Sequence, residues 1–310
     1  MAAMATTGAS LHAQERQTVS DPGFKLPPNA TDCHSHIFDP ENFPYAAGRR
    51  YTPPPATVVD LLRMHDRFGL QREVLVQPSV YGTDNSCLLA ALRQLGTRAC
   101  GVAVIDRNFS RSRLDDMVSS GIKGVRINLE VSKNADPALA VEKLQETADQ
   151  ITGSGLMILM YAQLPVILAC APTVRSLKQR VLIDHFGLAK AVGGVTQPGF
   201  SDLLGLMASP NVYMKMSGPY QVSDKGPAYD DIAPIARAML ATAPDRVVWG
   251  SDWPHTGGSN RPADYKATDL EPFRVEDDGR DIGLIKDWAP DSRLRQKLLV
   301  DNPAQLFGFR

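Results

Sequence analysis

Two histidines separated by one residue, His34 and His36, stand in the stretch TDCHSHIFDP. The residues just before them read as a short strand, and alternate side chains of a strand point to the same face. This alternation predicts that Asp32, His34 and His36 share one face, while Cys33 faces the other side and is not expected to be a nucleophile. The two imidazoles can then reach one point, either as catalytic groups or as hydrogen-bonded residues at the rim of a core.

Two further segments carry ionisable side chains where an apolar run ends. His185 follows VLID, and Asp252 follows VVWGS. Three imidazoles and one carboxylate match a mononuclear divalent-metal site with an open position, and they also match a metal-free site in which the carboxylate activates water. We therefore predict one catalytic group that consists of His34, His36, His185 and Asp252. Asp184 is interpreted as a supporting or structural carboxylate, because it precedes His185 and points the opposite way.

Polar residues near other strand ends are candidates for binding a substrate. Arg126, in GVRIN, is the sharpest of them, because a guanidinium binds a carboxylate through two parallel hydrogen bonds and is rarely buried without an anion. A salt bridge inside the protein is the alternative. The remaining candidates are Tyr51, Ser79, Tyr161, Lys215 and His255. His65, within a helical pattern, is expected to be a surface or interface histidine.

The segments that must position these residues alternate between two patterns. Apolar runs of strand length are separated by helical patterns. The expected strands are 30–34, 72–77, 99–105, 123–129, 156–162, 180–186, 211–217 and 245–253. The expected helices are 55–69, 84–96, 111–120, 137–154, 165–179, 199–209 and 229–243. Eight buried, parallel strands with helices between them predict an α/β fold, a closed (β/α)8 TIM barrel, whose active site lies at the carboxyl ends of the strands.

Composition limits the kind of partner. The chain has 310 residues, of which 43% are hydrophobic, and its 33 basic and 34 acidic residues leave a net charge of -1 with no run of one sign. Neither a nucleic acid nor a membrane surface is an expected partner, and a small molecule is. The four cysteines lie far apart, which argues against a disulfide framework. No Gly-rich fingerprint follows the first strand, which counts against a dinucleotide-binding fold.

The chain is expected to contain one folded domain. Residues 29–310 form the predicted catalytic barrel, and residues 1–28 a flexible N-terminal arm. A cytoplasmic location is expected. The alternative is the periplasm, if residues 1–13 are the tail of a truncated export signal, although they lack a basic beginning. The sequence leaves the oligomeric state open, a homo-oligomer included.

The motifs D-x-H-x-H, VLIDHFG and WGSDWPH together resemble the amidohydrolase superfamily. The stretches VLVQPSVYGTDN, GIKGVRINL and MILMYA look similar to the branch of 2-pyrone-4,6-dicarboxylate lactonase, 4-sulfomuconolactone hydrolase and galactarolactone isomerase. The resemblance covers residues 29–310 and implies a TIM barrel of the amidohydrolase type. It also implies a hydrolase that opens a small carboxylated lactone.

The resemblance assigns roles to two groups of residues. It implies a core site of His34, His36, His185 and Asp252, in which Asp252 is the general base on the hydrolytic water. It implies that the substrate is held by Tyr51, Ser79, Arg126 and Tyr161. Two-metal members carry a lysine or glutamate after the fourth strand and a histidine after the fifth, where this chain has Arg126 and Tyr161. At most one metal ion is therefore expected; one Zn²⁺ and catalysis without metal both stay open.

Departures from the resemblance concern the substrate. The dicarboxylate lactonase carries further arginines where this chain reads LEVSKN, FGLAKA and GPYQVS, and Lys133 and Lys190 are imperfect replacements because lysine offers no fork. A dicarboxylate substrate is therefore in doubt. Three alternatives stay open beside lactone hydrolysis: metal-dependent decarboxylation of an aromatic acid, lactone isomerisation, and ligand binding without catalysis.

Overall fold

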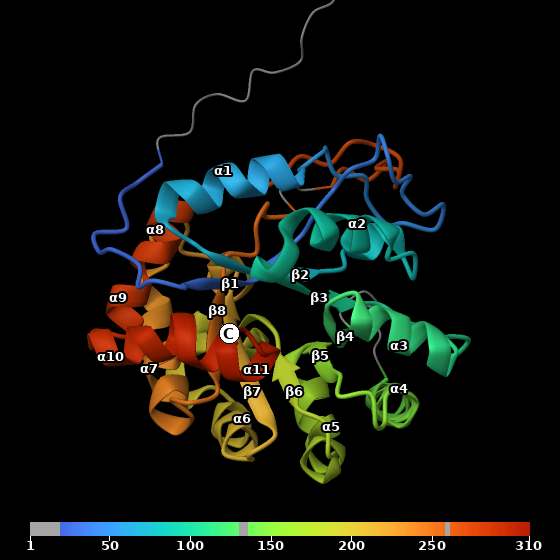
Figure 1. Ribbon diagram of the computed structural model, residues 1–310. Coiled ribbons are helices and arrows are strands. Elements are labelled where there is room, and N and C mark those ends of the chain that lie inside the picture. The colour runs from blue at the N-terminus through green and yellow to red at the C-terminus, as the bar shows by residue number, and fades with distance from the viewer. Residues whose placement is uncertain (1–18, 130–135, 258–260) are drawn as a thin grey trace, which may run out of the picture.

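A computed structural model describes residues 19–129, 136–257 and 261–310. Eight parallel strands follow one another in chain order around a barrel, with helices outside it (Figure 1). The strands are β1 (Thr31–Ser35), β2 (Arg72–Val76), β3 (Ala99–Ala103), β4 (Ile122–Asn128), β5 (Met157–Tyr161), β6 (Val181–Ile183), β7 (Val212–Ser217) and β8 (Val247–Gly250). The predicted (β/α)8 architecture is confirmed.

Helices cover the outside of the ring. Those between the strands are α1 (Val58–Phe68), α2 (Ser86–Leu95), α3 (Arg111–Ser119), α4 (Pro137–Gln150), α5 (Leu164–Ser176), α6 (Phe200–Met207) and α7 (Ala233–Thr242). Each coincides with a predicted helix. After β8 come four short helices that the sequence patterns did not indicate: α8 (Asp278–Gly283), α9 (Ile285–Trp288), α10 (Ser292–Gln296) and α11 (Asn302–Phe307).

The interior of the barrel is packed with apolar side chains. Strand residues such as Val76, Leu159 and Val248 form one buried cluster with Leu306 and Phe307 of α11. The C-terminal helices lie across the end of the barrel that faces the viewer in Figure 1. Because α11 packs at the amino ends of the strands, the carboxyl ends form the mouth that remains for a site.

β1 and β8 close the barrel without a regular ladder. Two backbone bonds join the chain just beyond them, from His36 N to Trp253 O (2.9 Å) and from Asp252 N to His34 O (2.8 Å). The side chain of Asp32 supplies further contacts. Its Oδ1 accepts hydrogen bonds from the amides of His34 (3.0 Å) and Ser251 (2.9 Å), and its Oδ2 accepts one from the Ser251 hydroxyl (2.5 Å).

The prediction that Asp32 shares a face with His34 and His36 is wrong. The pairing of β1 with β2 shifts register between Asp32 and Ser35. Such an irregularity interrupts the two-residue alternation of a strand. As a result Asp32 lies on the outer side, 3.8 Å from His65 of α1, and Cys33 joins the cluster inside the barrel. Burial there raises the pKa of the Cys33 thiol.

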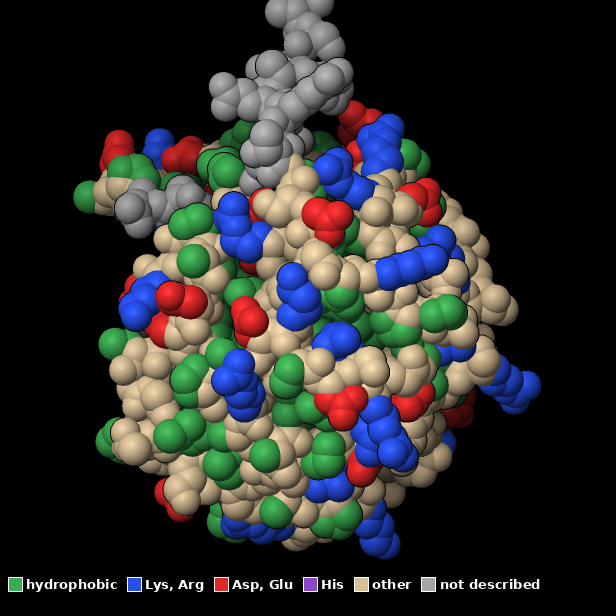
Figure 2. Space-filling model, turned by 90° about the vertical axis from the view of Figure 1, so that its left-hand side faces the viewer, with side chains coloured by type: hydrophobic (Ala, Val, Ile, Leu, Met, Phe, Trp, Pro, Cys, Tyr) green, Lys and Arg blue, Asp and Glu red, His purple; other side chains and the backbone are tan. Residues whose placement is uncertain are grey.

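The surface agrees with the balanced composition. On the face shown in Figure 2, basic and acidic side chains are interspersed over the described residues. Of the described helices, none has the length and apolar character needed to cross a membrane. Of the expected N-terminal arm, residues 1–18 lie outside the described residues. Ser20 contacts the barrel domain: its amide and hydroxyl donate hydrogen bonds to the Asp277 carboxylate (3.0 and 2.6 Å).

Gly250 tests how closely β1 and β8 must approach. A Cβ at this position would lie 2.7 Å from both Cβ and the backbone N of His34, and backbone cannot move aside cheaply. We expect Gly250→Ala to lower the free energy of unfolding by about 1 to 3 kcal/mol, as overpacking does. Chemical denaturation measures this change.

Gly205→Ala is the matched control. Gly205 lies in α6, and a Cβ there would meet nothing within 4 Å. We expect this variant to gain about 0.5 to 1 kcal/mol, because alanine is the better helix former. Equal stability of the two variants would contradict the close approach of the two strands.

Candidate active site

The four residues predicted to form a catalytic group meet at the carboxyl ends of the strands. Nε2 of His34 lies 3.3 Å from Nε2 of His36 and 3.5 Å from Oδ1 of Asp252. Nδ1 of His185 lies 4.0 Å from Oδ2 of Asp252. All four residues are buried, none more than 5% exposed. Segments that are far apart in the sequence therefore place three imidazoles and one carboxylate around a single point.

The backbone adopts unusual conformations where it delivers these groups. His185 has φ 47° and Asp252 has φ 65°, a region that costs a residue other than glycine about 1 to 3 kcal/mol. Gly218, after β7, packs against both: a Cβ there would lie 2.8 Å from Oδ2 of Asp252 and 3.3 Å from Nδ1 of His185. The turn at His185 also explains why β6 ends at Ile183, three residues before the predicted end.

Asp252 is held as a carboxylate. Burial would raise the pKa of its carboxyl group, but His185, His34 and His36 together lower that pKa well below its usual range. The hydroxyl of Tyr220 donates a short hydrogen bond (2.6 Å) to Oδ2. Oδ1 lies 3.5 Å from Nε2 of His34 and 3.8 Å from Nε2 of His36. Tyr220 is not among the predicted site residues, because its only signal in the sequence is its place in a loop after a predicted strand.

The two histidines of β1 and its following loop are neutral. Burial, reinforced by the nearby charge of Lys215, lowers the pKa of His34 well below its usual range. Burial, reinforced by Arg126, lowers the pKa of His36 to about 4. Neutral imidazoles can donate a hydrogen bond from one ring nitrogen and offer a lone pair on the other.

Lys215, a predicted substrate contact, lies behind His34. Its side chain is fully buried, with Nζ 3.0 Å from Nδ1 of His34 and 3.0 Å from Oδ1 of Asp184. Oδ1 of Asp184 is itself 3.3 Å from Nδ1 of His34. Burial would raise the pKa of Asp184, but Lys215 and His34 lower it well below its usual range. These internal partners argue against direct contact of Lys215 with a substrate.

Arg126 of β4 carries a positive charge beside the histidines. Its Nη1 donates a hydrogen bond to the carbonyl of Gln77 (3.2 Å), and its guanidinium lies 5.5 Å from the ring centre of Tyr161. Within the described residues, no carboxylate lies within 4.0 Å of it, and its buried Nε has no hydrogen-bond partner there. A cation without an internal anion is suited to bind an external one.

Tyr51, Ser79 and Tyr161 surround the same space. Burial raises the pKa of the Tyr51 hydroxyl, while hydrogen bonding by Ser79 and the charge of Arg126 oppose the rise. The Tyr161 ring packs 5.0 Å from the His185 ring. The predicted substrate-binding residues other than Lys215 and His255 therefore lie together beside the four central residues.

His255, also a predicted substrate contact, pairs with a carboxylate through one of its ring nitrogens. Its Nε2 lies 2.9 Å from Oδ1 of Asp278. Burial would lower the pKa of His255, but Asp278 raises it to about 9. The ring lies 5.8 Å from that of Tyr220, and its buried Nδ1 has no hydrogen-bond partner among the described residues.

Lys133 and Lys190 were considered as replacements for the arginines that hold a second carboxylate in the dicarboxylate lactonase. Nζ of Lys190 donates a hydrogen bond to the carbonyl of Gln221 (2.7 Å). Lys133 lies outside the described residues.

Three of the four central residues could hold a metal ion. His34, His185 and Asp252 offer ligand atoms that all lie within 4.8 Å of one another. Two imidazoles and a carboxylate are a donor set that suits zinc, so the residues fit a divalent ion in type and spacing. His36, the fourth predicted ligand, is not in this group, although its Nε2 lies 3.8 Å from Oδ1 of Asp252.

A second acid–base cluster lies behind β1, between the barrel and α1. His65 is buried there, with Nε2 2.8 Å from Oε2 of Glu73, and Ser35 donates a hydrogen bond to Oε1 of the same Glu73 (2.9 Å). Asp32, the third member, accepts the hydrogen bonds that join β1 to β8. His65 is thus an interface histidine, and this cluster supports the strands rather than facing the mouth.

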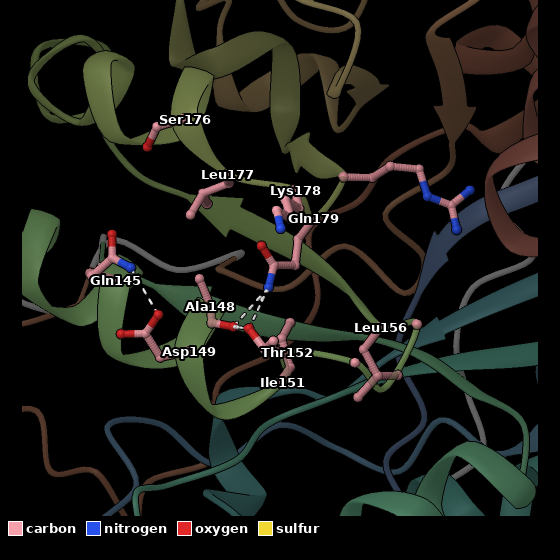
Figure 3. Close-up of a pocket in the computed structure, with 13 residues that line it drawn as sticks. Gln145, Ala148, Asp149, Ile151, Thr152, Leu156, Ser176, Leu177, Lys178 and Gln179 are labelled. Carbon is pink, nitrogen blue, oxygen red and sulfur yellow. Dashed lines mark hydrogen bonds between the residues drawn. The ribbon is translucent and has the colours of Figure 1, made fainter.

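A surface pocket of about 540 Å³ lies elsewhere, between α4 and α5. Figure 3 shows that Gln145 donates a hydrogen bond to Asp149 of the same helix (2.9 Å) and that Gln179 donates one to the carbonyl of Ala148 (2.8 Å). Its lining includes the residues that precede β5 and β6, so it is at the amino ends of the strands. It is separate from the four central residues.

Comparisons with known proteins agree with the site. The amidohydrolase family model matches residues 31–309. The chain is 35% identical to a 4-sulfomuconolactone hydrolase of Rhizobium radiobacter, covering 92% of each chain. It is 35% identical to a 2-pyrone-4,6-dicarboxylate hydrolase of Comamonas testosteroni, covering 93% of each.

Two further relatives extend the comparison. A D-galactarolactone isomerase of Agrobacterium fabrum is 29% identical, with 94% of each chain covered. The crystal structure of a putative 2-pyrone-4,6-dicarboxylic acid hydrolase from Pseudomonas putida superposes with a TM-score of 0.75 at 30% identity, covering 92% of this chain and 99% of that one. The family match spans nearly the whole barrel, and this protein therefore belongs to the amidohydrolase family.

Proposed function

We propose that this protein is a hydrolase that opens a small lactone bearing a carboxylate, with Asp252 as the base that activates water. One observation carries the proposal: an ionised, buried carboxylate contacts neutral imidazoles beside a guanidinium that no described carboxylate neutralises. The hydrolases at 35% identity, which are named for lactone substrates, support the same chemistry.

Arg126 anchors the carboxylate of the substrate through a forked pair of hydrogen bonds. The hydroxyl groups of Tyr51, Ser79 and Tyr161 complete the binding surface. Holding the acid at one end fixes the lactone carbonyl relative to Asp252, and such orientation removes much of the entropic barrier to attack.

The three arginines that lie against Tyr161, Tyr51 and Tyr220 favour a substrate with one carboxylate. Two other arginines, both in the loop after β8, are already paired. Nε of Arg261 lies 2.9 Å from Glu271, and Nε of Arg274 lies 3.0 Å from Glu276. Of these three arginines, Arg126 is therefore the one that is free to bind an external anion.

Asp252 takes a proton from water as the water oxygen attacks the lactone carbonyl. Tyr220 fixes Oδ2, so Oδ1 is the oxygen that accepts this proton. The carbon–oxygen bond of the ring then breaks, and the proton passes to the departing ring oxygen. General base catalysis of this kind contributes about 10²- to 10⁴-fold.

The charge that develops on the carbonyl oxygen requires stabilisation. The ring N–H of the neutral His34 is the donor that this chain supplies for it. A divalent ion, zinc from the donor set, held by His34, His185 and Asp252 would instead supply Lewis-acid polarisation of the carbonyl.

Labelled water distinguishes the three reactions considered for this scaffold. A panel of mono- and dicarboxylated lactones and aromatic acids is incubated with the enzyme in H₂¹⁸O. We expect ring opening with one ¹⁸O in the new carboxylate, because water is the nucleophile. Product without label would instead indicate isomerisation, and released carbon dioxide would indicate decarboxylation.

Asp252→Asn tests the base. We expect kcat on a lactone that the wild type opens to fall by at least about 10²-fold, because an amide cannot accept the proton. Binding, measured by calorimetry, should persist because the amide is isosteric. Asp66→Asn, at an exposed position of α1, is the control. Near-normal turnover by Asp252→Asn would refute its assignment as the base.

Arg126→Met tests the anchor. We expect it to weaken binding of a carboxylated ligand by about 1.5 to 3 kcal/mol, the usual loss for a hydrogen bond to a charged group. The methyl ester of the same ligand should bind the variant and the wild type alike. Arg63→Met, exposed on α1, is the matched control. If affinity for the acid is unchanged in Arg126→Met, the guanidinium is structural.

A further inference from the structure

The proton on His36 is placed by a neighbouring carbonyl. Nδ1 of His36 lies 2.7 Å from the backbone oxygen of Val76 in β2. A carbonyl oxygen can only accept a hydrogen bond, so Nδ1 carries the hydrogen. Because this imidazole is neutral, its Nε2 presents a lone pair toward His34.

His34, the neighbour of His36, contacts a group that can only donate hydrogen bonds. Nζ of Lys215 lies 3.0 Å from Nδ1 of His34, and a lysine ammonium has no acceptor. Nδ1 of His34 therefore accepts, and the proton of this neutral ring is on Nε2. That N–H points at the Nε2 lone pair of His36, 3.3 Å away.

Each contact in this series then pairs one donor with one acceptor. It runs from Lys215 through His34 and His36 to the carbonyl of Val76. If the hydrogen of His34 were on Nδ1 instead of Nε2, two donors would face each other at Lys215. Two lone pairs would then face each other between the histidines. The two ends, which come from β7 and β2, independently require the same arrangement.

A metal ion needs the opposite arrangement at His34. Ligation through Nε2 requires a lone pair there and a hydrogen on Nδ1, which a carboxylate commonly accepts. Asp184 is such a carboxylate, with Oδ1 3.3 Å from Nδ1 of His34. Lys215 occupies the closer hydrogen-bonding position and also pairs with this carboxylate (3.0 Å).

We propose that Lys215 is a positioning residue that keeps the His34 proton on Nε2, so that His34 offers a ligand an N–H shared with His36, rather than a lone pair, and the site binds a divalent metal weakly. The proposal rests on the proposed function in one respect only, the use of this N–H to polarise the lactone carbonyl. The placement of the proton and the metal affinity are properties of the protein without substrate.

Nitrogen NMR of the wild-type protein tests the proton directly. Protein labelled with ¹⁵N-histidine and stripped of metal by a chelator is compared with His34→Gln to assign the ring signals. We expect protonated Nε2 and unprotonated Nδ1 for His34, and the reverse for His36. A hydrogen on Nδ1 of His34 would overturn the proposal, whether or not any Lys215 variant folds.

Zinc titration of variants tests the consequence. In Lys215→Met, Asp184 is free to accept a hydrogen from Nδ1 of His34. We expect zinc to bind 10- to 100-fold tighter than to the wild type, the range typical of changes next to a ligating histidine. Lys215→Met/Asp184→Leu lacks the acceptor as well, because leucine has no oxygen at this position, and should lose most of this gain.

The outcomes separate this proposal from the proposed function. Equal or weaker zinc binding by a folded Lys215→Met protein would refute the control of metal affinity by Lys215. A gain that survives in the double variant would show that charge removal alone, rather than the proton on His34, sets the affinity. Failure to open any lactone would refute the proposed function and leave both measurements valid.

Discussion

The carboxylate of Asp32 is the contact on which the arrangement of the site depends. It accepts hydrogen bonds from the amides of His34 and Ser251 at the place where the first and last strands of the barrel meet without a ladder. Each of these amides belongs to a segment that carries a central group, His34 on one side and Asp252 on the other. A single buried side chain thus sets the distance between an imidazole and the carboxylate. Gly250 permits the approach because it has no Cβ.

Around this point the charges are arranged in layers. Lys215 and Asp184 lie deepest and neutralise each other, 3.0 Å apart and fully shielded from solvent. Above them are imidazoles that burial keeps neutral, together with the ionised Asp252. Arg126 is placed beyond them, without a carboxylate partner among the described residues. A negative base at the centre and a free cation at the side suit a neutral reactive group that is attached to an anionic handle, which describes a carboxylated lactone.

The sequence predicted those parts of the fold that follow from periodicity. Apolar runs alternating with helical patterns indicated all eight strands, and polar residues at strand ends indicated the central group. Three features escaped because periodicity does not encode them. The irregular pairing of β1 turned Asp32 outward and Cys33 inward. Tyr220 lies in a loop, where no pattern marks its bond to Asp252. The short helices after β8 are too brief to show a helical repeat.

Four side chains at one point do not by themselves decide how a histidine-rich site works. The same imidazoles can ligate a metal or donate hydrogen bonds, and the choice depends on which ring nitrogen carries the hydrogen. In this protein that choice is made by groups one layer away: the carbonyl of Val76 on β2 and the ammonium of Lys215 on β7. Proteins that share the central residues but differ at positions 184 and 215 would then differ in metal affinity without any change in the ligands themselves. Comparison of such sites should therefore begin with the partners of the histidines, because these partners determine which chemistry the histidines can perform.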